Sequence, residues 1–231
     1  MDNVKNCAFY DKCNHKDCAL DHFCLRKYKL DTLYLNALMT ESQKKHLVLK
    51  VDADNRDLEA FKQLAAIEAD IVNFIADGKN LFLHSAMCGN GKSSWSIRLL
   101  EAYFNKIWAR ADDSCHALFI SVPRFLLAIK DNITVKSTYV EYIKDNVYTA
   151  DIVVWDDLGS KTGSEFEISH LLNIIDNRIA AGKSNIYTSN LNRSQMYQAL
   201  GDRLTSRVVN LSTDIEFFGA DKRVLSTEVK E

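Results

Sequence analysis

Residues 86–93 read Ala86-Met87-Cys88-Gly89-Asn90-Gly91-Lys92-Ser93. This segment follows a short apolar run at 80–83 and precedes an amphipathic stretch at 95–108. A strand, a loop of small residues that ends in Gly-Lys-Ser, and a helix are the context of a phosphate-binding loop. In such loops, backbone N–H groups of the loop and of the helix N-terminus bind phosphate oxygens. We therefore expect these residues, together with Ser94, to bind a nucleotide.

Two side chains of this loop have specific roles in the predicted nucleotide site. Lys92 is expected to reach the β- and γ-phosphates, and the hydroxyl of Ser93 is expected to bind Mg²⁺. Ala86 stands where the G-x-x-x-x-G-K-[ST] pattern has its first glycine, and its Cβ is compatible with the turn if φ stays negative. The alternative is a glycine turn with an exposed lysine, which fits the order of strand, loop and helix less well.

A second candidate for nucleotide chemistry is the pair Asp156 and Asp157, which directly follows the apolar run at 151–155. In a phosphate-loop fold, the carboxyl ends of the strands face the nucleotide. Asp156 is then expected to bind Mg²⁺, directly or through water, and Asp157 is expected to orient or activate the attacking water. A solvated turn after a buried strand is the alternative, and the phosphate loop earlier in the chain argues against it.

Apolar runs and helical patterns alternate along the chain. Strands are expected at 80–83, 117–122, 151–155, 184–190 and 215–218. Helices are expected at 25–45, 55–77, 95–108, 124–131, 137–148 and 163–181. Pro123 is expected to end the second strand. This alternation predicts an α/β fold in which a parallel sheet has helices on both faces.

Composition limits the classes of protein that fit. The chain has 231 residues, 47% of them hydrophobic, and a formal net charge of −2, so nucleic-acid binding would need a local basic patch. No apolar run has the length of a membrane span, and the first residues lack the apolar region of a secretory signal. We expect a cytoplasmic protein without membrane contact, whose cysteines are reduced.

Four cysteines lie within the first 24 residues: Cys7, Cys13, Cys18 and Cys24. So short a segment cannot bury a core of its own, and a tetrahedral Zn²⁺ held by thiolates would supply the missing folding energy. The nearly regular spacing favours all four cysteines as ligands, with His22 as an alternative fourth ligand in a CCCH set. Free thiols, a disulfide and an iron–sulfur cluster are the other interpretations. Interleaved basic and aromatic residues suit single-stranded nucleic acid and a protein partner equally well.

Four motifs in order resemble those of AAA+ ATPases of the DnaC/DnaI helicase-loader group, in its phage or prophage branch. They are the phosphate loop, the Asp-Asp-Leu-Gly segment 156–159, and the segments 187–190 and 202–207. The resemblance extends over residues 46–223. It implies a P-loop ATPase domain at 46–231. It also implies a zinc-binding and helical linker segment at 1–45 that docks on the helicase.

The resemblance also implies roles for four residues nearer the end of the chain. Asn190 resembles sensor 1, which positions water against the γ-phosphate. Arg207, or alternatively Arg203, resembles the arginine finger that reaches into a neighbouring subunit's nucleotide, and Arg223 resembles a sensor 2 residue. An arginine supplied in trans makes ATP hydrolysis slow and dependent on assembly. Surface ion pairs are the alternative for Arg203 and Arg207.

The function that the resemblance implies is ATP-dependent loading of a hexameric, DnaB-type replicative helicase onto single-stranded DNA. ATP, Mg²⁺ and Zn²⁺ are the implied cofactors, and self-association through the ATP sites is implied as well. The segment after Arg207 is too short for the helical lid domain of most AAA+ proteins, which fits helicase loaders and IstB-like transposition ATPases alike. An IstB-like regulator on duplex DNA and a nucleotide-gated adaptor with little hydrolysis are the alternatives.

Overall fold

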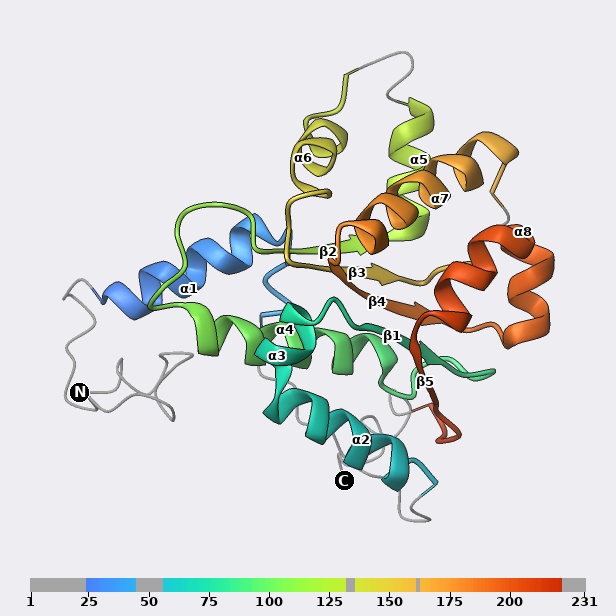
Figure 1. The fold of residues 1–231 in the computed structure, drawn as a ribbon, viewed down its shortest axis with the longest axis horizontal. Coiled ribbons are helices and arrows are strands. Elements are labelled where there is room, and N and C mark those ends of the chain that lie inside the picture. The colour runs from blue at the N-terminus through green and yellow to red at the C-terminus, as the bar shows by residue number, and fades with distance from the viewer. Residues whose placement is uncertain (1–23, 45–55, 132–135, 161–162, 222–231) are drawn as a thin grey trace, which may run out of the picture.

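The computed structural model describes residues 24–44, 56–131, 136–160 and 163–221. Within these residues, five strands form one parallel sheet in the order β2-β3-β4-β1-β5 (Figure 1). The strands are β1 (Asn80–His84), β2 (Ala117–Ser121), β3 (Ile152–Asp156), β4 (Ser184–Ser189) and β5 (Thr213–Glu216). The helices are α1 (Leu25–Asn36), α2 (Leu58–Ala69), α3 (Ile71–Ala76), α4 (Lys92–Ile107), α5 (Val122–Asp131), α6 (Thr138–Asn146), α7 (Glu165–Ala180) and α8 (Arg193–Asn210).

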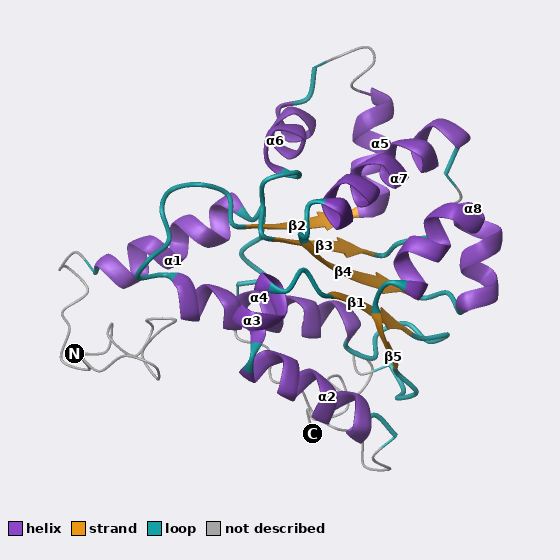
Figure 2. Ribbon diagram, viewed as in Figure 1, coloured by secondary structure: helices purple, strands orange, loops and turns teal. Residues whose placement is uncertain are grey.

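Helices cover both faces of the sheet, as Figure 2 shows. One hydrophobic core joins the sheet to α1–α4, and a second joins it to α5–α8. Successive residues of a strand point to opposite faces, so Ile152 and Val154 lie in the first core, whereas Val153 and Trp155 lie in the second. A strand buried on both faces needs a continuous apolar run. The parallel sheet with helices on both faces confirms the predicted α/β fold.

The strands agree with the sequence to within two residues, but two predicted helices are wrong in extent. The helix predicted at 55–77 is two helices, because α2 ends at Ala69 and α3 begins at Ile71. Between them Asp70 has φ −113° and ψ 26°, and its N–H donates to the carbonyls of Ala66 and Ile67. The helix predicted at 25–45 ends at Asn36.

Two further helices differ from the sequence prediction. α5 begins at Val122, so Pro123 lies in its first turn, where the missing N–H has no intrahelical partner to lose. α8 was not predicted. It begins with a capping box formed by Asn192 and Gln195, and Gly201 interrupts it with φ 75° and ψ 168°. This kink explains why a single helical period is hard to read in the sequence.

Helix α1 packs on the same core as the phosphate-loop helix α4. Leu30, Leu33 and Tyr34 are buried there, and the carbonyl of Ala37 accepts a 2.8 Å hydrogen bond from the N–H of Phe119 in β2. The second half of the predicted N-terminal segment is therefore built into the body of the molecule. The predicted boundary at residue 45 stays a prediction.

A buried arginine of α7 hydrogen-bonds to the segment before β3 and to the start of β4. The guanidinium of Arg178, fully buried, donates 2.8 Å to Asn185 Oδ1 and 2.6 Å to the carbonyl of Ser184. It also donates to the carbonyls of Val147 and Ala150, which lie before β3. Burial lowers the pKa of Arg178 to about 10, which leaves the side chain charged at neutral pH.

Replacing Arg178 with methionine is expected to lower the free energy of unfolding by about 3 kcal/mol. The substitution leaves a side-chain oxygen and three carbonyls buried without this donor. Urea denaturation followed by circular dichroism measures the loss. The control is Arg193→Met, at the surface of α8 with a side chain 58% exposed. Equal stability of the two variants would contradict the structural role of Arg178.

Candidate functional site

The phosphate loop connects β1 to the N-terminus of α4. In the sheet, β1 lies between β4 and β5. Gly91, with φ 108°, precedes the first residue of α4. Among the non-glycine residues that the structure describes, only Leu38 and Asp157 have positive φ. Ala86 therefore meets the condition under which alanine can replace the first glycine of the pattern.

Side chains within the loop hold its shape. Ser85 Oγ accepts 3.0 Å from the N–H of Met87 and 2.6 Å from the side-chain amide of Asn90. Lys92 is buried, and its ammonium donates 2.9 Å to the carbonyl of Met87 and 2.9 Å to Asn90 Oδ1. The exposed residues of the loop are Ala86, Met87 and Cys88, and Ser94 is half-buried in the first turn of α4. Lys92 is therefore not exposed as the alternative of a simple glycine turn expects, and its role in phosphate binding stays a prediction.

The backbone conformation at position 89 favours glycine. Gly89 has φ 73°, and a Cβ on it would lie 1.8 Å from Asp221 Oδ1. Asp221 belongs to the segment after β5, in which the N–H groups of Phe218 and Gly219 donate 2.7 Å and 3.0 Å to Asp57 Oδ1. The end of the described chain therefore lies against the phosphate loop.

The predicted acidic pair lies at the carboxyl end of β3, next to the phosphate-loop helix. Asp156 Oδ1 accepts 2.8 Å from the hydroxyl of Thr188 on β4. Burial raises the pKa of the Asp156 carboxyl above its usual range, while hydrogen bonds from the hydroxyls of Ser93 and Thr188 act in the opposite direction. Ser93, in the first turn of α4, therefore lies near enough to Asp156 at the end of β3 to act on its carboxyl. A hydroxyl and a carboxylate are the oxygen ligands that Mg²⁺ prefers, so these residues fit the predicted magnesium site.

The next residue, Asp157, has a backbone conformation that few residues adopt. Its φ is 59°, a left-handed value that aspartate tolerates better than most side chains. Its N–H donates 2.9 Å to Thr188 Oγ1, and its Oδ1 accepts 3.4 Å from the side-chain amide of Asn190. The two residues predicted to handle the attacking water therefore lie side by side at the ends of adjacent strands.

Thr188 is the residue of this site that the sequence analysis did not single out. Its hydroxyl accepts from Asp157 and donates to Asp156, so it links both carboxylate residues. Only the pairing register of β3 and β4 reveals this role of Thr188. Trp155 pairs with Tyr187, which places Asp156 beside Thr188. Sequence spacing alone does not give that register.

The two candidate finger arginines lie on the second half of α8, beyond the kink. Arg207 Nε donates to Asp176 on α7, and the two side chains are 46% and 34% exposed. Arg203 is exposed and has no side-chain partner among the described residues. In the isolated chain, Arg207 therefore forms the surface ion pair that was its alternative interpretation, at a position accessible to a neighbouring subunit.

Several predicted ligands fall outside the described residues, namely Cys7, Cys13, Cys18, His22 and Arg223. Cys24 is described, and its Sγ accepts from the N–H of Lys27 at the start of α1. Within the described ranges, no group of three or more His, Cys, Asp or Glu side chains is placed to hold a metal ion. The zinc site stays a prediction.

A five-stranded parallel sheet, a phosphate loop after its β1 strand and an acidic strand end beside that loop define an α/β fold of the AAA+ P-loop type. The solved structures of DnaC, DnaI and DnaA contain domains with this fold. None of the described helices has the length and apolar character that a bilayer crossing needs.

Comparison with known proteins narrows this class. No protein-family model matches the chain. The replicative helicase loader DnaC of Escherichia coli K12 is 25% identical over 150 residues, which are 65% of this chain and 55% of the relative. The chain thus spans about half the length of the curated relatives that it matches.

Solved structures share the fold at low sequence identity. The DnaC helicase loader has a TM-score of 0.56 and 21% identity, over 69% of this chain and 89% of that one. DnaI has a TM-score of 0.59 and 19% identity, over 80% and 94%. AMPPCP-bound DnaA from Aquifex aeolicus has a TM-score of 0.53 and 16% identity, over 82% and 56%. Together with the curated relative, these matches confirm the resemblance to DnaC/DnaI-type AAA+ helicase loaders.

Proposed function

We propose that this chain is an ATP-dependent loader of a hexameric, DnaB-type replicative helicase onto single-stranded DNA. The observation that carries the proposal is that the phosphate loop lies near Asp156 at the carboxyl end of β3. Lys92 and Ser93 lie near enough to Asp156 to act on its carboxyl, in a chain whose sequence matches a replicative helicase loader. Helicase loading is the role named for that relative, and similarity in sequence and fold supports the same role here.

In the proposed ATPase, each part of the site has a task. The backbone N–H groups of residues 86–94 and the ammonium of Lys92 bind the phosphates, and Ser93 and Asp156 hold Mg²⁺. Asp157 and Asn190, joined by their hydrogen bond, orient the attacking water. Bound Mg²⁺ neutralises charge on the phosphates. Arg223 is proposed to reach the phosphates as well.

The proposed reaction needs a second subunit. Arg207, with Arg203 as the alternative, would supply positive charge to the nucleotide of a neighbouring copy, because an arginine in trans stabilises transition-state charge. The exposure of both side chains supports this role. Turnover by the isolated chain would then be slow, and self-association through the ATP sites would increase it.

Thr188→Val is expected to reduce ATP hydrolysis about tenfold, since partners of metal ligands typically contribute that much. Valine has the shape of threonine but cannot hydrogen-bond to Asp156 or Asp157, whose positions depend on Thr188. Phosphate release at saturating ATP and Mg²⁺ measures the loss. Thr213→Val, at an exposed position of β5, is the control. An unchanged rate for Thr188→Val would remove Thr188 from the site.

The helicase-loading proposal is tested by size-exclusion chromatography with light scattering, on the full chain mixed with the host replicative helicase, with and without ATP. The proposal expects a complex that is lost when residues 1–23 are deleted, because this segment is proposed to bind zinc and dock on the helicase. The deletion stops before α1, since α1 belongs to the hydrophobic core.

Other outcomes of this experiment distinguish the alternatives. A complex without phosphate release, even with DNA present, would favour a nucleotide-gated adaptor. Absence of a helicase complex, together with a salt-sensitive footprint on duplex DNA, would favour an IstB-like transposition regulator. Either result would overturn the loader proposal.

A further inference from the structure

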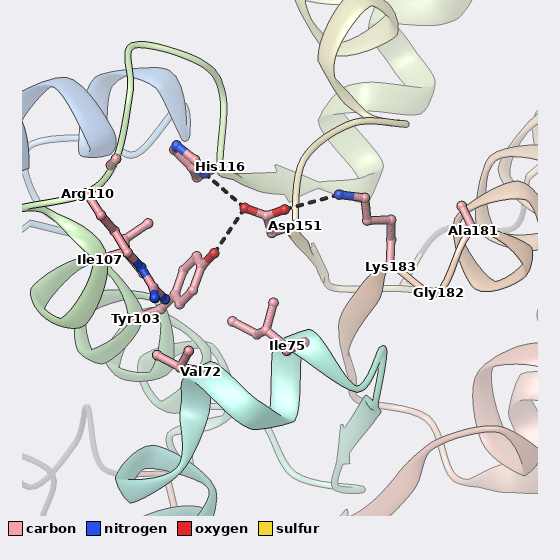
Figure 3. A pocket seen from close by; sticks show the side chains of 12 residues that line it. Val72, Ile75, Tyr103, Ile107, Arg110, His116, Asp151, Ala181, Gly182 and Lys183 are labelled. Carbon is pink, nitrogen blue, oxygen red and sulfur yellow. Dashed lines mark hydrogen bonds and ion pairs between the residues drawn. The ribbon is translucent and has the colours of Figure 1, made fainter.

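A cavity of about 510 Å³ lies at the amino ends of β2, β3 and β4 (Figure 3). The phosphate loop lies at the opposite, carboxyl ends of the strands. Its walls come from α3, the end of α4, and the residues that precede β2, β3 and β4. A volume of this size is within the range of sites for small organic ligands. Nothing in the proposed ATPase cycle uses this cavity.

The sheet itself assembles the polar wall of the cavity. His116, Asp151 and Lys183 are the residues immediately before β2, β3 and β4, which are neighbours in the sheet. The N–H of Asp151 donates 2.9 Å to the carbonyl of His116, and the N–H of Ser184 donates 3.1 Å to the carbonyl of Asp151. Three polar side chains therefore form a row whose spacing is fixed by strand pairing.

Asp151 is fully engaged at the centre of this row. Its Oδ2 accepts 2.9 Å from His116 Nδ1 and 3.0 Å from the hydroxyl of Tyr103, and its Oδ1 accepts 3.1 Å from Lys183. Burial favours the neutral acid, but the hydrogen bonds from His116, Lys183 and Tyr103 lower the pKa of Asp151 overall. The carboxylate is thus charged and satisfied, so it positions its neighbours and is not free to bind a ligand.

The charge that remains in the cavity is positive. The side chains of Arg110 and Lys183 line it against the one carboxylate of Asp151. Among the described residues, the guanidinium of Arg110 has no hydrogen-bond acceptor and no ion pair. Figure 3 shows it along the wall formed by Ile107 and Tyr103. Just outside, the ammonium of Lys29 and the carboxylate of Asp112 balance each other in charge. An anionic group is the complement of this wall.

Apolar side chains line the rest of the cavity. Val72 and Ile75 of α3 face Ile107 at the end of α4. Ala111, which follows α4, also lines the cavity. Apolar side chains that line a cavity gain stability when a ligand excludes water from them. A ligand that fits both the charged and the apolar lining carries one negative charge and a compact apolar group next to it.

We propose that this cavity binds a carboxylate attached to a small apolar group, with Arg110 as the principal partner of the carboxylate. The planar guanidinium matches a carboxylate with two parallel hydrogen bonds, and Lys183 adds a second positive charge. The apolar group lies against Ile75 and Ile107. This chemistry occurs in a free organic acid and at the end of a protein chain whose last residue is apolar.

The probes for the experiment are N-acetyl-leucine and its amide, titrated into the ¹⁵N-labelled full chain and followed by two-dimensional NMR. N-acetyl-leucine is expected to give saturable shifts at residues of the cavity. The amide, which lacks the charge, is expected to bind at least about tenfold more weakly. Hexanoate represents a free acid. Binding comparable to that of N-acetyl-leucine would identify free acids as a source, and much weaker binding would favour a chain end.

Arg110→Gln is expected to weaken binding of N-acetyl-leucine about tenfold, with an unchanged melting temperature because Arg110 is exposed. Lys130→Gln, which removes one exposed positive charge from α5 on the other face of the sheet, should bind as the unaltered chain does. The proposal is overturned if the acid and the amide bind equally, if Arg110→Gln binds normally, or if no probe gives saturable shifts. In those cases the row of His116, Asp151 and Lys183 serves only to hold the strand ends together.

Discussion

Lys92→Ala is expected to weaken ATP binding by about a hundredfold or more, since hydrogen bonds from a charged donor to phosphate contribute roughly 2–3 kcal/mol. The ammonium of Lys92 is held inside the phosphate loop by Met87 and Asn90, so it is already positioned for an incoming phosphate. Burial raises the pKa of Asp156, and the positive charge of Lys92 acts against that rise. Titration with a fluorescent ATP analogue measures the loss.

The control for this experiment separates loss of charge from loss of structure. Lys92→Ala leaves a buried cavity and removes a donor from Asn90, so Lys92→Met, which keeps the length of the stem, should be studied beside it. Lys62→Ala, at an exposed position of α2, should bind ATP normally. If both Lys92 variants are folded and still bind ATP as the unaltered chain does, the loop is not a nucleotide site and the proposed function fails with it.

Arg207→Ala is expected to leave ATP binding unchanged and to reduce hydrolysis by about a thousandfold. In the proposed assembly, Arg207 completes a neighbour's site, whereas in its own chain it pairs with Asp176 on α7. An exposed pair of this kind contributes at most about 1 kcal/mol, so the variant should remain folded. Phosphate release measured over a range of protein concentrations gives the rate.

Mixing two inactive variants tests whether the arginine acts in trans. Lys92→Ala chains still present Arg207, and Arg207→Ala chains still bind ATP, so a mixture of the two should recover part of the hydrolysis. Arg193→Ala, with an exposed side chain on the same helix, should be fully active. Failure of the mixture to recover, together with a rate per chain that does not depend on concentration, would contradict a finger in trans.

The sequence was most informative where local pattern and chemistry coincide. The strands that carry Leu83 and Trp155 are buried on both faces, so their apolar runs are continuous and their ends are marked by the phosphate loop and by Asp156. The place of Asp156 near the phosphate-loop helix agrees with the rule that parallel strands present their carboxyl ends together. The sheet and the central part of the site could therefore be predicted without coordinates.

Features that depend on tertiary packing could not be predicted in this way. The role of Thr188 depends on the register between β3 and β4, and that of Arg178 depends on carbonyls that converge from three segments. Asp70 breaks a helix whose apolar period continues across it. Helix α8 was likewise not recognised in the sequence, because Gly201, with φ 75°, divides it into two short pieces. In each case, either the interacting residue is distant in sequence, or the backbone conformation cannot be recognised from the hydrophobic pattern.

The place of β1 between β4 and β5 has a consequence for how the chain folds during synthesis. Asn80 at the start of β1 hydrogen-bonds to Asn185, 105 residues later, and β5 on its other side lies later still. Closing such distant contacts has a high entropic cost, and parallel pairing of this kind is slow. The phosphate loop follows β1 directly, so it gains a fixed support only after nearly the whole described chain has left the ribosome. A ribosome-bound fragment that ends before β4 has the complete loop sequence but lacks the two strands that hold the loop in place.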